Sequence, residues 1–63
     1  MKGMVVFYVN VGQLPPKKAE AYLTAKREKN KELIDNIKAE DYGVVFQPIT
    51  KGDGRIEVLK LRG

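Results

Sequence analysis

The sequence predicts a small α+β domain of the form β-α-β-β, with a three-stranded mixed sheet and one long helix. An apolar, β-branched segment occupies residues 4–11, and a stretch rich in Ala, Lys, Glu and Leu follows over residues 16–39. Two further short apolar segments, 42–49 and 55–61, are separated by a glycine-rich turn. Alternation between strand-type and helix-type segments is the sequence pattern of this class. We expect residues 1–63 to form a single small domain.

The first strand is predicted over residues 4–11, between Gly3 and Gly12. Val, Phe and Tyr dominate this segment, and these residue types are enriched in strands. Apolar side chains occur at both odd and even positions, so both faces of the strand are apolar. Such a run is typical of a strand that is covered on both sides or paired centrally.

The helix is predicted over residues 16–39. Pro15 and Pro16 cannot donate to a sheet, and Pro16 suits the first turn of a helix. Apolar residues then recur at helical spacing: Ala19, Tyr22, Leu23, Leu33, Ile34 and Ile37.

The middle of this helix lacks apolar residues. The apolar stripe should pass through Lys26 and then through Lys29 or Asn30, which are all polar. One interpretation is a single long helix that overruns the strands, and the other is two short helices that turn near Asn30. We predict the single helix and keep the two-helix arrangement as the alternative.

The second and third strands are predicted over residues 42–49 and 55–61. Pro48 places the second strand at a sheet edge or ends it. The turn Lys51–Gly54 contains Asp-Gly, the strongest short hairpin signal, so these two strands should pair as an antiparallel hairpin. A right-handed crossover would make the first two strands parallel. One face of the sheet would remain bare.

Composition excludes several function classes. The chain has 63 residues, with 12 Lys+Arg against 8 Asp+Glu, and it contains no Cys, His or Ser. Disulfides, the usual zinc sites and Ser-His or Cys-His nucleophiles therefore cannot form. We expect a protein that is not an enzyme and needs no cofactor or metal. Because a domain of this size has a marginal core, association with other chains is the remaining way to stabilise it.

The sequence also predicts whether the protein associates with a membrane and where it is located. No apolar run approaches the roughly 20 residues that cross a bilayer, and residues 4–11 are too short for a signal peptide. We expect no membrane association and a cytoplasmic location.

Four basic residues in the middle of the helix are candidate nucleic-acid contacts. The net charge of +4 is compatible with phosphate binding. Glu28 and Glu32 lie among these residues and dilute their field, so an ordinary solvated helix face is the more conservative interpretation. The candidates are Lys26, Arg27, Lys29 and Lys31, with Lys17 and Lys18 at the start of the helix.

Aromatic residues on the strands have two interpretations. Phe7, Tyr8 and Phe46 could offer a stacking platform for single-stranded nucleic acid. The glycine-rich pattern of RNA-recognition sheets is missing around them, so we predict that they pack in the core.

A partner interface is predicted on the helix and on the bare sheet face. The shortage of core and the two-sided first strand indicate a homo-oligomer or a complex with another protein. The apolar helix positions proposed for this interface are Tyr22, Leu33, Ile34 and Ile37.

Two segments resemble portal proteins of large contractile-tailed bacteriophages. Residues 6–15, read as V-F-Y-V-N-V-G-Q-L-P, and the following K-A-E-A-Y-L at 18–23 are similar to a strand that enters a helix in that family. Residues 40–42 and 52–59 are similar to a later family segment with a glycine-rich turn. Asn10 replaces the usual Asp, Gly43 stands where Trp is expected, and the segment that forms the clip is missing.

The resemblance implies a structural role without a catalytic residue. A portal is a ring whose subunits each have several hundred residues. This chain would therefore be a portal-like fragment or a small phage protein that acts as an assembly factor or inhibitor. Its partner would be itself or a phage or host protein, in the host cytoplasm or the virion. The alternative function is a small basic nucleic-acid-binding module.

Overall fold

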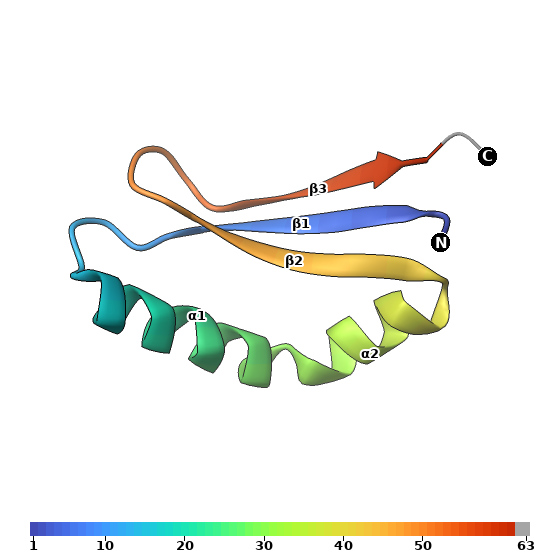
Figure 1. Ribbon diagram of the computed structural model, residues 1–63, viewed down its shortest axis with the longest axis horizontal. Coiled ribbons are helices and arrows are strands. Elements are labelled where there is room, and N and C mark those ends of the chain that lie inside the picture. The colour runs from blue at the N-terminus through green and yellow to red at the C-terminus, as the bar shows by residue number, and fades with distance from the viewer. Residues whose placement is uncertain (62–63) are drawn as a thin grey trace.

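Three strands form one mixed sheet, and two consecutive helices cover part of one of its faces (Figure 1). The structure is a computed structural model and describes residues 1–61. The α+β class and the three-stranded mixed sheet are confirmed. The elements in chain order are β1 (Gly3–Asn10), α1 (Pro16–Lys29), α2 (Lys31–Ala39), β2 (Tyr42–Ile49) and β3 (Arg55–Lys60).

The strand β1 lies in the centre of the sheet, whose order is β2-β1-β3. It runs parallel to β2 and antiparallel to β3, so that Val5 lies opposite Val44 on one side and Val58 on the other. The predicted parallel pairing and the central position of the most apolar strand are therefore confirmed. Central pairing satisfies the backbone of β1 on both edges.

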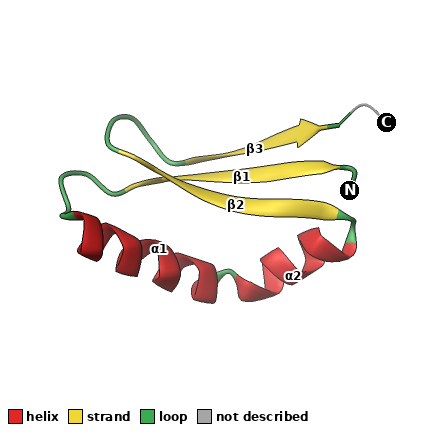
Figure 2. Cartoon of the chain, in the orientation of Figure 1, coloured by secondary structure: helices red, strands yellow, loops and turns green. Residues whose placement is uncertain are grey.

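The predicted hairpin between β2 and β3 is wrong. The chain reverses after β2, but β3 crosses to the far side of β1 and pairs there (Figure 2). Val11 N–H donates to the Ile49 carbonyl at 2.9 Å, so the backbone groups of Ile49 face β1. Backbone groups of successive strand residues face opposite edges, so those of Pro48 face away from β1. A hairpin partner on that side would meet a residue that cannot donate, so Pro48 keeps β2 at the edge.

The predicted single helix is divided at Asn30, as the two-helix alternative proposed. Asn30 has φ −106° and ψ 21°, outside helical values, and separates α1 from α2. Its backbone N–H and its side-chain Nδ2 both donate to the Lys26 carbonyl, at 3.1 and 2.8 Å. These bonds satisfy the end of α1 and let α2 turn back toward the sheet, where Ile34 is buried.

The core lies between the sheet and α2. Val5, Phe7, Ile34 and Phe46 form its buried cluster. Phe7 and Phe46 face each other across β1 and β2 with their rings stacked, 4.7 Å between centroids and 5° between planes. The prediction that these aromatic residues pack in the core is confirmed for this pair. The helix α1 contributes no buried residue.

Candidate interaction surface

An open groove lies between α1 and β3, on the helix-covered face of the sheet. It has a volume of about 630 Å³ and is called the α1–β3 groove below. Phe7, Val9 and Phe46 line it from the sheet, and Ile56 lines it from β3. The lining is completed by Tyr22 and Lys26 of α1, by Asn30 at the break between the helices, and by Leu33 of α2.

The groove exists because α1 has too little apolar surface to fill it. The half-buried residues of α1 and the break recur at the spacing of one helix face, and they are Ala19, Leu23, Lys26 and Asn30. The first is small and the last two are polar, so only Leu23 reaches the sheet as a large apolar side chain. The sequence prediction that Lys26 and Asn30 interrupt the apolar stripe is therefore confirmed.

Large apolar side chains remain exposed around this groove. Ile56 is 58% exposed, Leu33 44% and Tyr22 40%. Val58 lies opposite Val5, which faces the core, so it extends the same face along β3 and is 54% exposed. These side chains make one apolar surface on three elements, α1, α2 and β3.

Two cations lie beside aromatic rings that line the groove. The Lys26 ammonium lies 5.4 Å from the centre of the Tyr22 ring, and the Arg27 guanidinium lies 5.4 Å from that of Phe46. Both distances are within the range of cation–π attraction. Of the two cations, Lys26 lines the groove, whereas Arg27 lines a second, smaller cavity together with Ile34, Lys38 and Val44.

The four helix residues predicted as a partner interface do not lie on one surface. Tyr22 and Leu33 line the groove, as the prediction requires. Ile34 is only 9% exposed within the core, and Ile37 packs against the same cluster. The core of this small sheet uses both isoleucines, because they are the apolar residues of α2 that face β2.

Ile56 and Val58 are surface residues that the sequence prediction does not include. The predicted hairpin gives β3 the wrong neighbour and leaves its two faces unassigned. The alternation of Ile56 and Val58 with Glu57 indicates one apolar face. That signal was present in the sequence.

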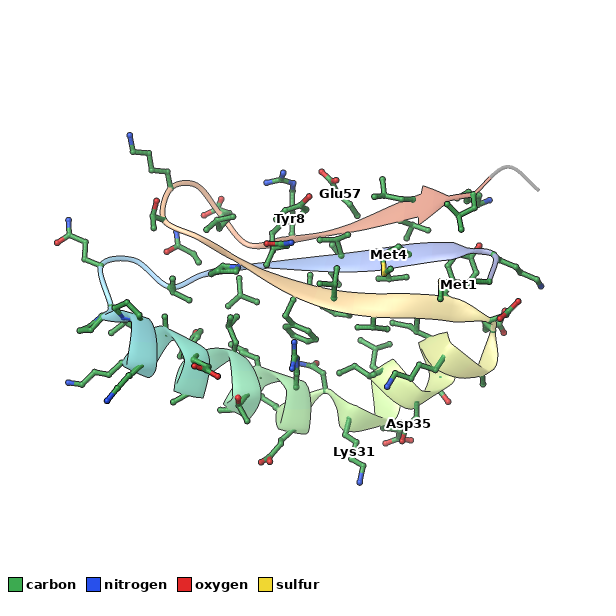
Figure 3. All side chains as sticks on the ribbon, in the orientation of Figure 1. Met1, Met4, Tyr8, Lys31, Asp35 and Glu57 are labelled. Carbon is green, nitrogen blue, oxygen red and sulfur yellow. The ribbon has the colours of Figure 1, made fainter. Side chains whose placement is uncertain are left out.

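The predicted nucleic-acid contacts are dispersed. Lys26 and Arg27 lie beside aromatic rings on the sheet side of α1. Lys29 and Lys31 are exposed on either side of Asn30, and Lys31 points away from the sheet (Figure 3). The structure therefore does not gather the four cations on one surface.

The opposite face of the sheet is bare, as predicted, and is polar at one end. The Arg55 guanidinium lies 4.1 Å from the centre of the Tyr8 ring, and Arg55 Nε donates to Glu57 Oε1 at 3.0 Å. Met4 and Tyr8 alternate along β1 with the core residues Val5 and Phe7, so they lie on this face, and the prediction that Tyr8 packs in the core is wrong. Toward the other end of β1 the face is apolar, with Met4 beside the exposed Leu59.

No protein-family model, curated protein or solved structure matches this chain. Among residues 1–61, no helix combines the length and the apolar character that a membrane crossing requires.

Proposed function

We propose that this chain is a non-enzymatic protein-interaction protein that works as a homo-oligomer or bound to a partner protein. The observation that carries this proposal is the open α1–β3 groove with exposed Tyr22, Leu33 and Ile56 around it. A contiguous apolar surface beside a groove is typical of a protein-binding site. Scattered exposed apolar residues would not support the same conclusion.

The energy available at this surface is large for so small a protein. Full burial of an exposed Ile or Leu side chain is worth about 1.5–3 kcal/mol. Ile56 and Leu33 are roughly half exposed, at 58% and 44%. Covering both would add a few kcal/mol, which is a substantial part of the stability of a small domain.

Sedimentation equilibrium at micromolar protein concentration tests this function. We expect the wild-type chain to sediment with a mass above the 7.1 kDa of one copy, or to do so when its partner is added. The double variant Ile56→Thr and Leu33→Ser should weaken association. Leu14→Thr is the matched control, because Leu14 is 42% exposed but lies outside the groove. A stable monomer that no candidate partner binds would overturn the proposal.

A role in phage head assembly is the more specific form of this proposal. Its support is the resemblance to portal proteins. The first similar segment covers residues 6–10 of β1 and the first half of α1, and the later one covers residues 55–59 of β3. The chain would then act as an assembly factor, an inhibitor or a portal-like piece. Biolayer interferometry against portal subunits of contractile-tailed phages tests this form, and absence of binding at high micromolar concentration would contradict it.

A small nucleic-acid-binding module is the alternative function. The observation that favours it is the pair of cations, Lys26 and Arg27, beside aromatic rings at the groove. Filter binding of single-stranded RNA and DNA across a salt series tests it. A steep loss of affinity with salt is expected if several phosphates are contacted. A flat or undetectable response would remove this alternative.

A further inference from the structure

The two edges of the sheet are not equivalent. The edge strand β2 carries Pro48, and both helices pack chiefly against it. The other edge strand, β3, has six residues without Pro, Gly or a bulge, and its register with β1 is continuous. Natural sheets protect their edges with Pro, bulges, charged side chains or covering elements. The strand β3 carries Arg55, Glu57 and Lys60 but none of the other devices, so its backbone edge remains open to another strand.

The backbone groups that β3 offers can be identified from its ladder. Leu61 N–H donates to the Lys2 carbonyl at 2.9 Å, so Leu61 faces β1. Alternation along an antiparallel strand then turns Arg55, Glu57 and Leu59 toward β1 as well. The N–H and C=O groups of Ile56, Val58 and Lys60 therefore point outward from the sheet.

The space beside this edge is open. In Figure 1, β3 lies on the side of the sheet far from α1 and α2. A second strand can approach along its full length without meeting the helical layer of the same copy.

The molecule exposes more surface than a compact monomer of its mass. Its accessible area is 5029 Å², whereas about 4,100 Å² is typical for this mass. Its radius of gyration is 12.5 Å, against about 10.6 Å for a compact domain of this length. The excess of about 900 Å² is close to the roughly 800 Å² that each partner buries in a standard interface.

The sequence of β3 suits pairing with itself. In a two-fold antiparallel pair, outward-facing residues must lie opposite outward-facing residues. Within Arg55–Lys60, the two registers with the largest overlap that meet this condition place the axis at Glu57 or at Val58. The first sets Glu57 directly opposite its own copy, and like charges in that position are destabilising. The second sets Val58 opposite Val58.

From these observations we infer that two copies pair antiparallel through β3, with Val58 at the two-fold axis. This inference rests on the proposed function and names a second copy as the partner. The two sheets join into one continuous sheet, and the two α1–β3 grooves lie on the same face on either side of the axis. Val58 of both copies then meets at the centre of this shared face, and on each side of the axis Ile56 of one copy lies opposite Lys60 of the other.

Single cysteines in β3 test this arrangement. The chain has no Cys of its own, so Glu57→Cys, Val58→Cys and Leu59→Cys each give one reporter. Directly opposite residues in hydrogen-bonded positions lie about 5.5 Å apart at Cα, within disulfide reach. With the axis at Val58, positions 57 and 59 meet their own copies only diagonally, at about 7–8 Å. We expect Val58→Cys to give several-fold more disulfide dimer under mild oxidation.

The outcomes separate this inference from the proposed function. A maximum at Glu57→Cys would overturn the Val58 axis. A wild-type dimer with no cross-link at any of the three positions would overturn pairing through β3 and leave self-association standing. A wild-type chain that sediments as a monomer at these concentrations would overturn the pairing, and with no partner protein bound it would overturn the proposed function too.

A second variant tests the backbone edge rather than the side chains. Val58→Pro removes an outward-facing N–H that makes no hydrogen bond within the monomer. The proline would face outward from β3 as Pro48 faces outward from β2. We expect its dimer dissociation constant to rise about tenfold or more, since ladder hydrogen bonds are lost in both copies. Val58→Thr keeps the N–H and serves as the control. Equal dimerisation by the proline variant, with the fold verified by circular dichroism, would overturn the inference.

Discussion

Asn10 joins the two loops at the end of the sheet where β1 ends. Its Nδ2 donates to the Gly52 carbonyl at 2.6 Å, and its Oδ1 accepts from Gly12 N–H at 2.7 Å. A carboxylate at this position could accept the second bond but could not donate the first. The amide therefore fixes the turn after β2 against the turn after β1.

Replacing Asn10 tests this link. Asn10→Ala loses both hydrogen bonds, and we expect the free energy of unfolding to fall by about 1–2 kcal/mol. Asn10→Asp retains the acceptor and should lose about half as much. Urea denaturation followed by circular dichroism measures both. Equal losses in the two variants would show that the bond from Gly12 N–H, which Asn10→Asp retains, contributes nothing.

Gly3 permits the close approach of β1 and β3. A Cβ at this position would collide with the backbone carbonyl oxygen of Leu59, which cannot move without breaking the ladder. We expect Gly3→Ala to lower the free energy of unfolding by about 2 kcal/mol or more, as in overpacked cores. Thermal denaturation measures this loss.

Gly43 supplies the matched control for that variant. A Cβ there would lie 2.9 Å from Met4 Sδ, which belongs to a flexible side chain on the bare face. Because methionine adapts easily, Gly43→Ala should cost less than about 1 kcal/mol. Similar losses in both variants would contradict the assignment of Gly3 as the close-contact site.

At the scale of elements, α1 and α2 differ in how firmly they are attached. The helix α2 buries Ile34 in the core, whereas α1 buries no residue. Local opening costs little free energy where few apolar contacts must be broken. The break at Asn30 allows α1 to open while α2 remains in place.

Hydrogen exchange tests this difference. We expect amides in the middle of α1, over residues 20–27, to exchange at least about tenfold faster than those of α2 over residues 35–38. Exchange measured by NMR at neutral pH resolves the two helices. Equal protection would mean that they open as one unit.

Filling the groove from α1 should strengthen its attachment. Lys26 is half-buried and lines the groove, so Lys26→Leu would place an apolar side chain against Phe46 and Val9. We expect the free energy of unfolding to rise by about 1 kcal/mol. Lys29→Leu, at an exposed position, is the control and should change it by less than about 0.5 kcal/mol. Urea denaturation of both variants measures the difference.

Strand positions could be predicted from the sequence, but the neighbour of β3 could not. The segment 42–49 matches β2 at both ends, because β-branched and aromatic residues between turn signals specify a strand locally. The Asp-Gly turn specifies only that the chain reverses. Which strand receives β3 depends on the free edge of β1, which lies far from β3 in the sequence, and on Pro48, whose effect depends on how β2 is paired.

The residues that line the groove could likewise be predicted only in part from the sequence. Tyr22 and Leu33 could be proposed because they belong to an apolar stripe on the helix. Ile34 and Ile37 belong to the same stripe, and only the position of α2 over β2 separates core from surface. The contribution of Ile56 requires the topology of the sheet.

At the scale of the whole molecule, β1 and β3 bring the described ends of the chain together. Leu61 N–H donates to the Lys2 carbonyl at 2.9 Å. A sheet whose central strand comes first and whose partner comes last is dominated by contacts between distant residues, and such topologies fold slowly.

Circular permutation tests this effect of chain order. Joining the end of β3 to the start of β1 by a short glycine-rich linker, and opening the chain within residues 50–54, turns β3 and β1 into a local hairpin. We expect the permutant to fold faster, with an unchanged far-ultraviolet circular dichroism spectrum, in stopped-flow refolding. An unchanged folding rate would show that pairing of β3 does not limit folding.

Pro48 bears on how far an assembly of this sheet can grow. A pair formed through β3 has only the two β2 strands at its outer edges, and each carries a proline and lies beside helices. The two-fold pairing through β3 is isologous and closes on itself, and a further strand cannot add at the β2 edges with a complete ladder. The proline ring of Pro48, present once in each copy, would thus limit assembly to a discrete dimer and prevent an open fibril of stacked strands.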